Sequence, residues 1–131
     1  MSPESRLAVR IYYEDTDCGG VVYYANYLGY FERGRTEYLR ERGIELRAPL
    51  PNGIGFVVAR AEVDYRAPAH YGDLLEVETR ITQLSRASMT FAHRTHRAAT
   101  LIAEATVVLV CVADGRPCRI PDDIRRSLAD V

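Results

Sequence analysis

Residues 9–27 read VRIYYEDTDCGGVVYYANY, and inside this stretch the sequence changes from the pattern of a strand to that of a helix. β-Branched and aromatic residues predict a strand over residues 7–13, and the acidic, glycine-ended segment 14–20 predicts a loop. From Asn26, the predicted N-cap, aromatic and apolar residues recur every three or four positions. This pattern predicts one long helix of about 17 residues that ends at Gly43.

The rest of the chain predicts a sheet. Four long strands are expected at residues 55–65, 75–82, 89–96 and 101–111, followed by a weak helix at 121–129. Short connections between the later strands favour antiparallel pairing. One helix against one antiparallel sheet of about five strands is an α+β architecture, and residues 1–131 are expected to form a single domain. One helix covers only one face of such a sheet, so we expect a second subunit to cover part of the other.

The composition excludes several classes of chemistry. The formal net charge is -1, and all 17 cationic side chains are arginine. A chain without lysine has no amine for a Schiff base, for pyridoxal phosphate or for a P-loop, and its balanced charge disfavours nucleic-acid binding. The three cysteines lack metal-binding spacing, so we expect no metal site and a reducing, cytoplasmic setting. No signal-peptide pattern is visible, and the longest apolar run, 105–113, is too short for a bilayer, so we expect no integral membrane contact.

Four motifs carry the functional information. An Asp-x-Asp-x-x-Gly loop at residues 15–20 precedes the helix, and the helix contains FERGRTE at residues 31–37. The next strand continues into VDYRAPAHYGD at residues 63–73, and the C-terminal segment reads GRPCRIP at residues 115–121. These motifs, in this order, resemble the hotdog-fold acyl-CoA thioesterases, specifically the 4-hydroxybenzoyl-CoA thioesterase group and its Tol-Pal-associated branch. The resemblance covers nearly the whole chain.

This resemblance implies a hotdog fold, in which an antiparallel sheet wraps one long central helix. It also implies an enzyme that hydrolyses an acyl-CoA, with a short, medium-length or aromatic acyl group, to a carboxylic acid and free CoA. No cofactor is implied, because CoA is part of the substrate. Asp17 is the implied catalytic carboxylate, which either attacks the thioester carbon or activates water, whereas Asp15 is expected to be structural.

Tyr24 is the second implied catalytic residue, because its backbone N–H would polarise the thioester carbonyl. The Tol-Pal-associated branch usually has histidine at this position. A phenol, with an ordinary pKa of about 10, hydrogen-bonds or shapes the pocket and does not relay protons near neutral pH.

Four residues are expected to line the substrate near its thioester bond. Gly20 and Val22 belong to the loop itself, and Gly20 permits a tight turn and close approach of the substrate. Tyr65 and Pro68 are expected to reach the same pocket from a partner subunit. The resemblance implies at least a homodimer, and a homotetramer is expected.

The phosphates of CoA require cationic side chains, and arginine must supply them in a chain without lysine. By the resemblance, Arg86 and Ser88 lie in the turn that meets the nucleotide end of the substrate. Arg94 and Arg97 are candidate companions.

Other functions stay open at this point. An acyl-carrier-protein thioesterase would use the same carboxylate, and a non-catalytic acyl-CoA-binding protein would share the fold. A hydratase is disfavoured because no histidine follows Asp17 before His70, and Cys18 has no neighbouring histidine to activate it. His93 and His96 point to opposite faces of a strand, so they cannot share a metal ion.

Overall fold

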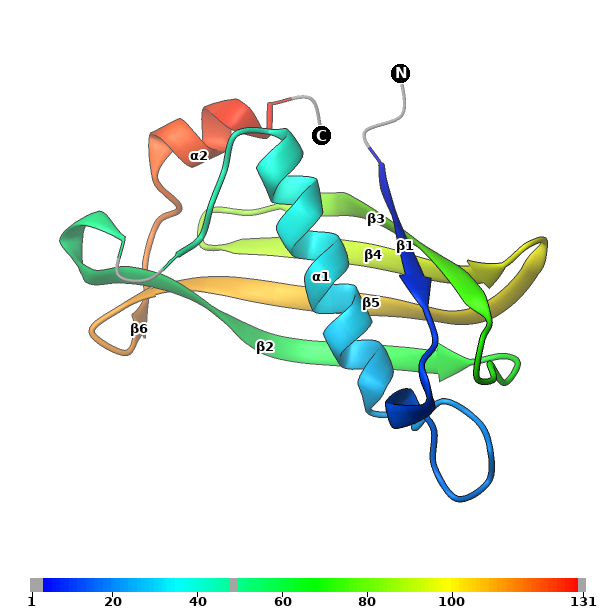
Figure 1. Ribbon diagram of the computed structural model, residues 1–131. Coiled ribbons are helices and arrows are strands. Elements are labelled where there is room, and N and C mark those ends of the chain that lie inside the picture. The colour runs from blue at the N-terminus through cyan, green and yellow to red at the C-terminus, as the bar shows by residue number, and fades with distance from the viewer. Residues whose placement is uncertain (1–3, 48–49, 130–131) are drawn as a thin grey trace.

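One long helix lies across one face of a twisted antiparallel sheet in the computed structural model, which describes residues 4–47 and 50–129 (Figure 1). The elements, in chain order, are β1 (Ser5–Arg10), the 3-10 helix η1 (Tyr13–Asp15), α1 (Asn26–Glu41), the 3-10 helix η2 (Pro51–Gly53), β2 (Ile54–Tyr65), β3 (Leu74–Leu84), β4 (Ser88–Arg97), β5 (Thr100–Ala113), β6 (Arg116–Pro117) and α2 (Asp122–Ser127). The arrangement confirms the predicted α+β class and the hotdog architecture. No helix within the described ranges is long and apolar enough to cross a membrane.

The five long strands pair in the order β1–β3–β4–β5–β2, and every neighbouring pair is antiparallel. The register places Thr79 of β3 opposite His93 of β4, which in turn lies opposite Ala105 of β5. The short strand β6 pairs with the last two residues of β5. β1 and β2 are therefore the edges of the sheet.

The end of β1 and the cap of α1 differ from the sequence-based prediction. β1 ends at Arg10, before the predicted end at Tyr13, and Tyr13 instead begins the 3-10 turn Tyr13–Asp15. The turn forms because the Asp15 carboxylate accepts the N–H of Tyr12 at 2.7 Å. α1 begins at Asn26 with Ala25 as its N-cap, and the Asn26 side chain instead donates to the Asp15 carbonyl at 2.9 Å.

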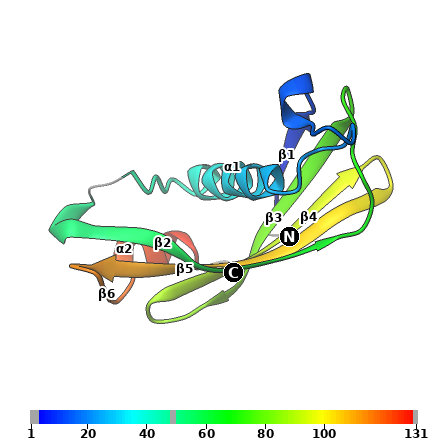
Figure 2. The same ribbon diagram turned by 90° about the horizontal axis from the view of Figure 1, so that it is seen from below.

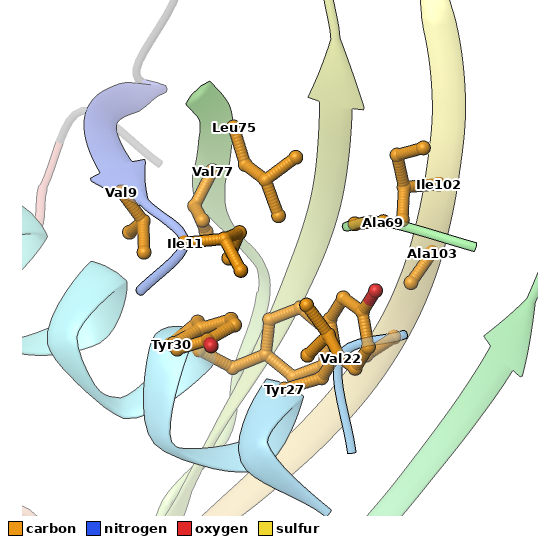
Figure 3. Close-up of a cluster of buried hydrophobic side chains, with 12 residues drawn as sticks. Val9, Ile11, Val22, Tyr27, Tyr30, Ala69, Leu75, Val77, Ile102 and Ala103 are labelled. Atoms are coloured by element: carbon orange, nitrogen blue, oxygen red, sulfur yellow. The ribbon is translucent and has the colours of Figure 1, made fainter. Parts of the chain in front are cut away.

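Buried side chains between α1 and the sheet form two hydrophobic clusters, one at each end of the helix. The cluster at the start of α1, shown in Figure 3 and called the N-terminal cluster below, consists of Val9, Ile11, Val22, Tyr27, Tyr30, Phe31, Ala69, Leu75, Val77, Ile102, Ala103 and Ala105. The cluster at the other end, called the C-terminal cluster, consists of Tyr38, Leu39, Ile44, Ile81, Met89, Phe91, Leu109, Cys111, Ile120, Ile124 and Leu128. The α2 segment packs only in the second of these.

A row of buried polar side chains separates the two clusters. The Arg35 guanidinium donates to His93 Nε2 at 3.2 Å, and His93 Nδ1 lies 3.0 Å from the Thr79 hydroxyl. Because a guanidinium only donates, Nε2 is the acceptor and the ring proton belongs on Nδ1. Burial, followed by the nearby Arg35 charge, lowers the pKa of His93 to about 3, so the ring is neutral at physiological pH. We call Arg35, His93 and Thr79 the polar seam.

Gly34 lets the helix approach the sheet at this seam. A Cβ atom added at Gly34 would lie 2.4 Å from Thr79 Oγ1 and 3.3 Å from Val77 Cγ1. A side chain at this position would therefore push the helix away from the sheet.

The edge strand β2 remains largely exposed. α1 contacts β1, β3 and, to a smaller extent, β4, and Figure 2 shows it lying on one side of the sheet. Val57 and Val58 of β2 are 48% and 51% exposed, although both are hydrophobic. Strand β2 has 12 residues and no neighbour on its outer edge within the part of the chain that is described, whereas β1 has 6 residues.

Candidate active site

Hydrogen bonds in the loop between β1 and α1 give its two aspartates different roles. Asp15 holds the loop together, because its carboxylate accepts the N–H of Tyr12 while its carbonyl accepts the Tyr23 N–H and the Asn26 side-chain amide, both at 2.9 Å. These contacts tie the end of β1 to the start of α1. Asp15 therefore has the structural role that was expected of it.

Asp17 occupies the first position of a tight turn. The Gly20 N–H donates to the Asp17 carbonyl at 2.9 Å, and the Asp17 N–H donates to the Val21 carbonyl at 2.9 Å. One carboxylate oxygen of Asp17 accepts the Gly19 N–H at 2.8 Å. The other oxygen has no hydrogen-bond partner among residues 4–47 and 50–129, and the side chain is exposed. The turn thus orients the carboxylate and leaves one oxygen available to a ligand.

Glycine is required at the fourth position of this turn. Gly20 has a φ of +81°, in the left-handed region that other residues rarely adopt. At Gly19, an added Cβ would lie 3.2 Å from the Asp17 carboxylate oxygen, so a side chain there would press on the carboxylate. The two glycines keep the surface beside Asp17 open.

The start of α1 presents hydrogen-bond donors near this loop. The Tyr24 N–H donates to no acceptor in the described part of the chain, and it lies two residues before the helix begins. The first N–H groups of a helix lack intrahelical partners and carry the positive end of the helix dipole, which favours a developing negative charge. This position can therefore stabilise an oxyanion.

The aromatic rings around Tyr24 come from two elements of the same chain. Its side chain is 62% exposed, and its ring centroid lies 6.2 Å from that of Tyr65 at the end of β2. The Tyr65 hydroxyl donates to the Tyr24 carbonyl at 2.9 Å, and the Tyr65 ring also packs edge-on against Tyr27. The chain thus brings Tyr65 to the helix start without a partner subunit.

Val22 and Pro68 also lie beside the loop. The Val22 side chain is buried in the N-terminal cluster, and its N–H donates to the Ala69 carbonyl at 2.9 Å, so Val22 supports the loop from beneath. The Pro68 carbonyl accepts a hydrogen bond from Arg97 at 2.9 Å. The 63–73 motif therefore packs against the Asp17 loop, since Val21 also forms an isolated β-bridge with His70.

Arg86 and Ser88 lie at the opposite end of the sheet, in and just after the β3–β4 turn (Figure 1). The 11 residues of β3 separate this turn from the Asp17 loop, a distance of roughly 35 Å for an extended strand. Arg86 is exposed, and its carbonyl accepts the Ile120 N–H at 2.9 Å. Within one chain, Arg86 and Ser88 cannot contact a ligand bound at Asp17.

Two other arginines, Arg10 and Arg97, lie close to the loop. Arg97 donates to Asp73 Oδ2 at 3.0 Å, and Arg10 donates to the Gly72 carbonyl at 2.6 Å. The backbone N–H of His70, aided by Arg97, holds the pKa of Asp73 below its ordinary value. The sequence analysis did not predict a role for Arg10 or Asp73. Asp73 is the last residue of the 63–73 motif, so the motif could have indicated it.

Two surface grooves lie away from the Asp17 loop. One, of about 560 Å³, is lined by residues such as Ile44, Pro51, Ile120 and Ser127 at the C-terminal end of α1. The other, of about 380 Å³, lies between α1 and β2 and includes Arg35, Phe56 and Val58. Neither contains Asp17, which is exposed. Within the described ranges, no group of three or more His, Cys, Asp or Glu residues is placed to hold a metal ion.

Comparison with known proteins gives the chain a family. The model of the thioesterase-like superfamily matches residues 12–128. The acyl-CoA thioester hydrolase YbgC of Escherichia coli O6:H1 is 46% identical over 108 residues, which are 82% of this chain and 81% of the relative. The acyl-CoA thioesterase YbgC of Haemophilus influenzae is 42% identical over 122 residues, 91% of this chain and 90% of the relative.

The fold comparison agrees with the sequence comparison. The crystal structure of a 1,4-dihydroxy-2-naphthoyl-CoA thioesterase from Synechocystis superimposes with a TM-score of 0.90 at 26% identity, covering 98% of this chain and 97% of that one. The family predicted from the four motifs is thus confirmed. The chain belongs to the thioesterase-like superfamily and is a hotdog-fold member of its acyl-CoA thioesterases.

Proposed function

We propose that the Asp17 carboxylate is essential to the thioester hydrolysis that this chain performs. The chain is an acyl-CoA thioester hydrolase by family and by its relatives. The observation that carries the role of Asp17 is the state of its carboxylate, which is exposed, held through one oxygen by the Gly19 N–H and free at the other. This carboxylate is positioned but still available to react.

Two routes use this carboxylate. In the first, the free Asp17 oxygen attacks the thioester carbon, the CoA thiolate leaves, and water hydrolyses the resulting mixed anhydride. In the second, Asp17 accepts a proton from a water molecule while that water attacks the same carbon, and the CoA thiolate leaves as the tetrahedral intermediate collapses to the carboxylic acid. In both routes the carbonyl oxygen becomes negative, and the free Tyr24 N–H at the positive end of α1 is the proposed donor to it.

The acyl group is proposed to be short, medium-length or aromatic. The exposed rings of Tyr23, Tyr24 and Tyr65 lie together at the helix start, with centroid distances of 5.0 Å and 6.2 Å from Tyr24 to the other two. Aromatic rings favour edge-to-face packing with other rings, which supports an aromatic acyl group. The Synechocystis thioesterase, whose named substrate is a naphthoyl-CoA, provides independent support.

We further propose that the site is completed in a homodimer, with dimers pairing as a tetramer. A long strand edge without a neighbour pairs readily with another chain, and β2 has 12 residues, among them the exposed Val57 and Val58. The position of Arg86 and Ser88 supports the same assembly, since they reach the nucleotide of a substrate only from another copy of the chain. Arg10 and Arg97 are the local alternatives for the phosphates.

Two alternative functions make different predictions. An acyl-carrier-protein thioesterase would cleave carrier thioesters faster than CoA thioesters. A non-catalytic acyl-CoA-binding protein would bind acyl-CoA without releasing thiol. The reaction is proposed to need no metal or other cofactor, and the three free thiols are those of a protein in the predicted reducing, cytoplasmic setting.

The test is thiol release from a panel of short, long and aromatic acyl-CoAs and the matching carrier thioesters. Asp17→Asn keeps an oxygen for the Gly19 N–H but removes the charge, and we expect kcat/KM to fall by about 10²–10⁴-fold. Glu14→Gln is the matched control, because Glu14 is an exposed acid of the same loop. Equal activity of Asp17→Asn and wild type would overturn the role of Asp17, while carrier-selective turnover would redirect the substrate.

A further inference from the structure

Two of the three cysteines lie side by side at the end of the sheet remote from the Asp17 loop. Cys111 belongs to β5 and Cys118 follows β6, and their Sγ atoms are 3.4 Å apart (Figure 1 shows β6). Cys111 is buried and Cys118 is partly exposed, and both are free thiols. Nothing in the proposed reaction uses either of them.

The backbone holds the two residues in a geometry that a disulfide accepts. Val112 pairs with Pro117 in the β5–β6 ladder, which places Cys111 opposite Cys118, and the Cys118 N–H donates to the Cys111 carbonyl at 2.8 Å. The two Sγ atoms already lie 3.4 Å apart, so the side chains point toward one another as a disulfide requires. Closing the bond to about 2.05 Å therefore needs side-chain rotation and little movement of the backbone.

We propose that Cys111 and Cys118 are a site of reversible intrachain disulfide formation, oxidised by exchange with a low-molecular-weight disulfide. The Cys118 thiolate attacks one sulfur of that disulfide, forming a mixed disulfide and releasing one small thiol. Cys111 then loses its proton and attacks the Cys118 sulfur, releasing the second small thiol. Two protein thiols are oxidised to one disulfide, and one small disulfide is reduced to two thiols.

The order of attack follows from the surroundings of the two sulfurs. Burial and then the hydrogen-bonding contact with Cys118 raise the pKa of the Cys111 thiol to about 12, which keeps it protonated. The more exposed Cys118 is therefore the first nucleophile. The contribution of the Cys118 thiol to that raised pKa disappears once Cys118 carries the mixed disulfide, which favours the second attack.

The bond would fasten the C-terminal segment to the sheet. Cys118 is followed directly by the segment that carries α2, whose Ile120, Ile124 and Leu128 are buried in the C-terminal cluster. The bond between Cys111 and Cys118 closes a short loop in the unfolded chain and lowers its conformational entropy, so the oxidised protein should be more stable.

The experiment uses the full-length Cys18→Ser protein, which removes the exposed third thiol. After incubation with oxidised glutathione, we expect both remaining thiols to disappear, the mass to fall by two hydrogen atoms, and peptide mapping to link Cys111 with Cys118. Tm should rise by at least about 4 °C and return on reduction with dithiothreitol.

The double variant Cys18→Ser/Cys118→Ser is the matched control. It should keep its single thiol at Cys111 and show the same Tm before and after treatment. A stable glutathione adduct on Cys118, a disulfide between two copies of the chain, or unreacted thiols in the Cys18→Ser protein would each overturn the proposal. Activity measured in parallel shows that each protein is folded.

Discussion

His93 shows how burial turns an ordinary titratable side chain into a pH-sensitive part of the fold. Its ring is 1% exposed and lies between the rings of Phe31 and Phe91, with stacked centroid distances of 4.9 Å and 6.2 Å. The Arg35 charge beside it adds to the effect of burial, and its pKa falls from 6.5 to about 3. The folded protein therefore resists protonation of a group that the unfolded chain protonates freely.

The sign of the resulting pH dependence can be predicted. Between pH 6.5 and about pH 3 the unfolded chain binds a proton at His93 that the folded chain does not, so acidification favours unfolding. Inside this window we expect His93 to contribute a loss of about 1.4 kcal/mol in the free energy of unfolding per pH unit. Above the window, its contribution does not change with pH. Urea denaturation at a series of pH values measures the slope.

His93→Gln is the informative variant, because glutamine can accept from Arg35 and donate to Thr79 without titrating. Its stability should fall less steeply with acidification than that of wild type. His96→Gln is the comparison, since His96 lies on the other face of β4 beside Glu78 at 3.5 Å and its substitution leaves the contacts of His93 with Arg35 and Thr79 in place. Identical slopes for wild type and His93→Gln would contradict the assignment.

For single residues, the sequence predicts the chemical role of a side chain better than it predicts which residues lie next to it in the fold. Spacing and resemblance predict Asp17 as the catalytic acid. In the sequence Asp15 and Asp17 are two acids of one motif, and only the hydrogen bonds of the folded loop show that their carboxylates have different contacts. The contact between Tyr65 and Tyr24 depends on where β2 ends relative to α1, which no local pattern specifies. The resemblance and its charge pointed to Arg86, but neither gives its distance from the Asp17 loop, which depends on the length of β3.

Helix α1 contains two glycines whose surroundings differ sharply. An added Cβ at Gly34 meets Thr79 Oγ1 at 2.4 Å, whereas at Gly29 it meets nothing within 4 Å. We expect Gly34→Ala to destabilise the protein by about 1–3 kcal/mol, because the helix must move away from the sheet. Gly29→Ala should be neutral or stabilise it by up to about 1 kcal/mol through helix propensity.

Urea unfolding midpoints of the two alanine variants make the comparison direct, because the substitution and the helix are the same. Equal stabilities would show that the seam tolerates a methyl group and that Gly34 is present for another reason. Gly34→Ala should also perturb His93, since the new methyl group would lie 3.7 Å from its Nδ1 atom. The NMR signals of the His93 ring report that change.

Most helices and strands were predictable from the sequence, because the spacing of their apolar residues matches the face that is buried. The alternation in β3 and β4 predicts their buried faces, and Leu75, Val77, Met89 and Phe91 are all fully buried. The end of β1 was not predictable, because Tyr12 and Tyr13 have high strand propensity while the hydrogen bond from the Tyr12 N–H to Asp15 ends the strand. A single side-chain contact here overrides the preference of two residues.

At the scale of the whole molecule, the proposed dimer gives the edge strand β2 a partner. The double variant Val57→Lys/Val58→Lys places two charges on this strand, and we expect it to dissociate the dimer and to lower activity with it. Gln83→Lys, an exposed position of β3, should change neither property. Light scattering after gel filtration measures the mass, and thiol release measures the activity. A wild-type protein that is monomeric and fully active would contradict the dimer proposal.

The polar seam has a further consequence for how this molecule can change over time. Because Arg35, His93 and Thr79 separate the two hydrophobic clusters, a substitution in one cluster does not have to be matched by repacking in the other. If α1 slid by one turn, the Arg35 guanidinium would leave His93 and enter one of the hydrophobic clusters, which is strongly unfavourable. The seam therefore also keeps the helix in register with the sheet. The C-terminal cluster can therefore accept substitutions over time while the N-terminal cluster, beside the Asp17 loop, keeps its packing.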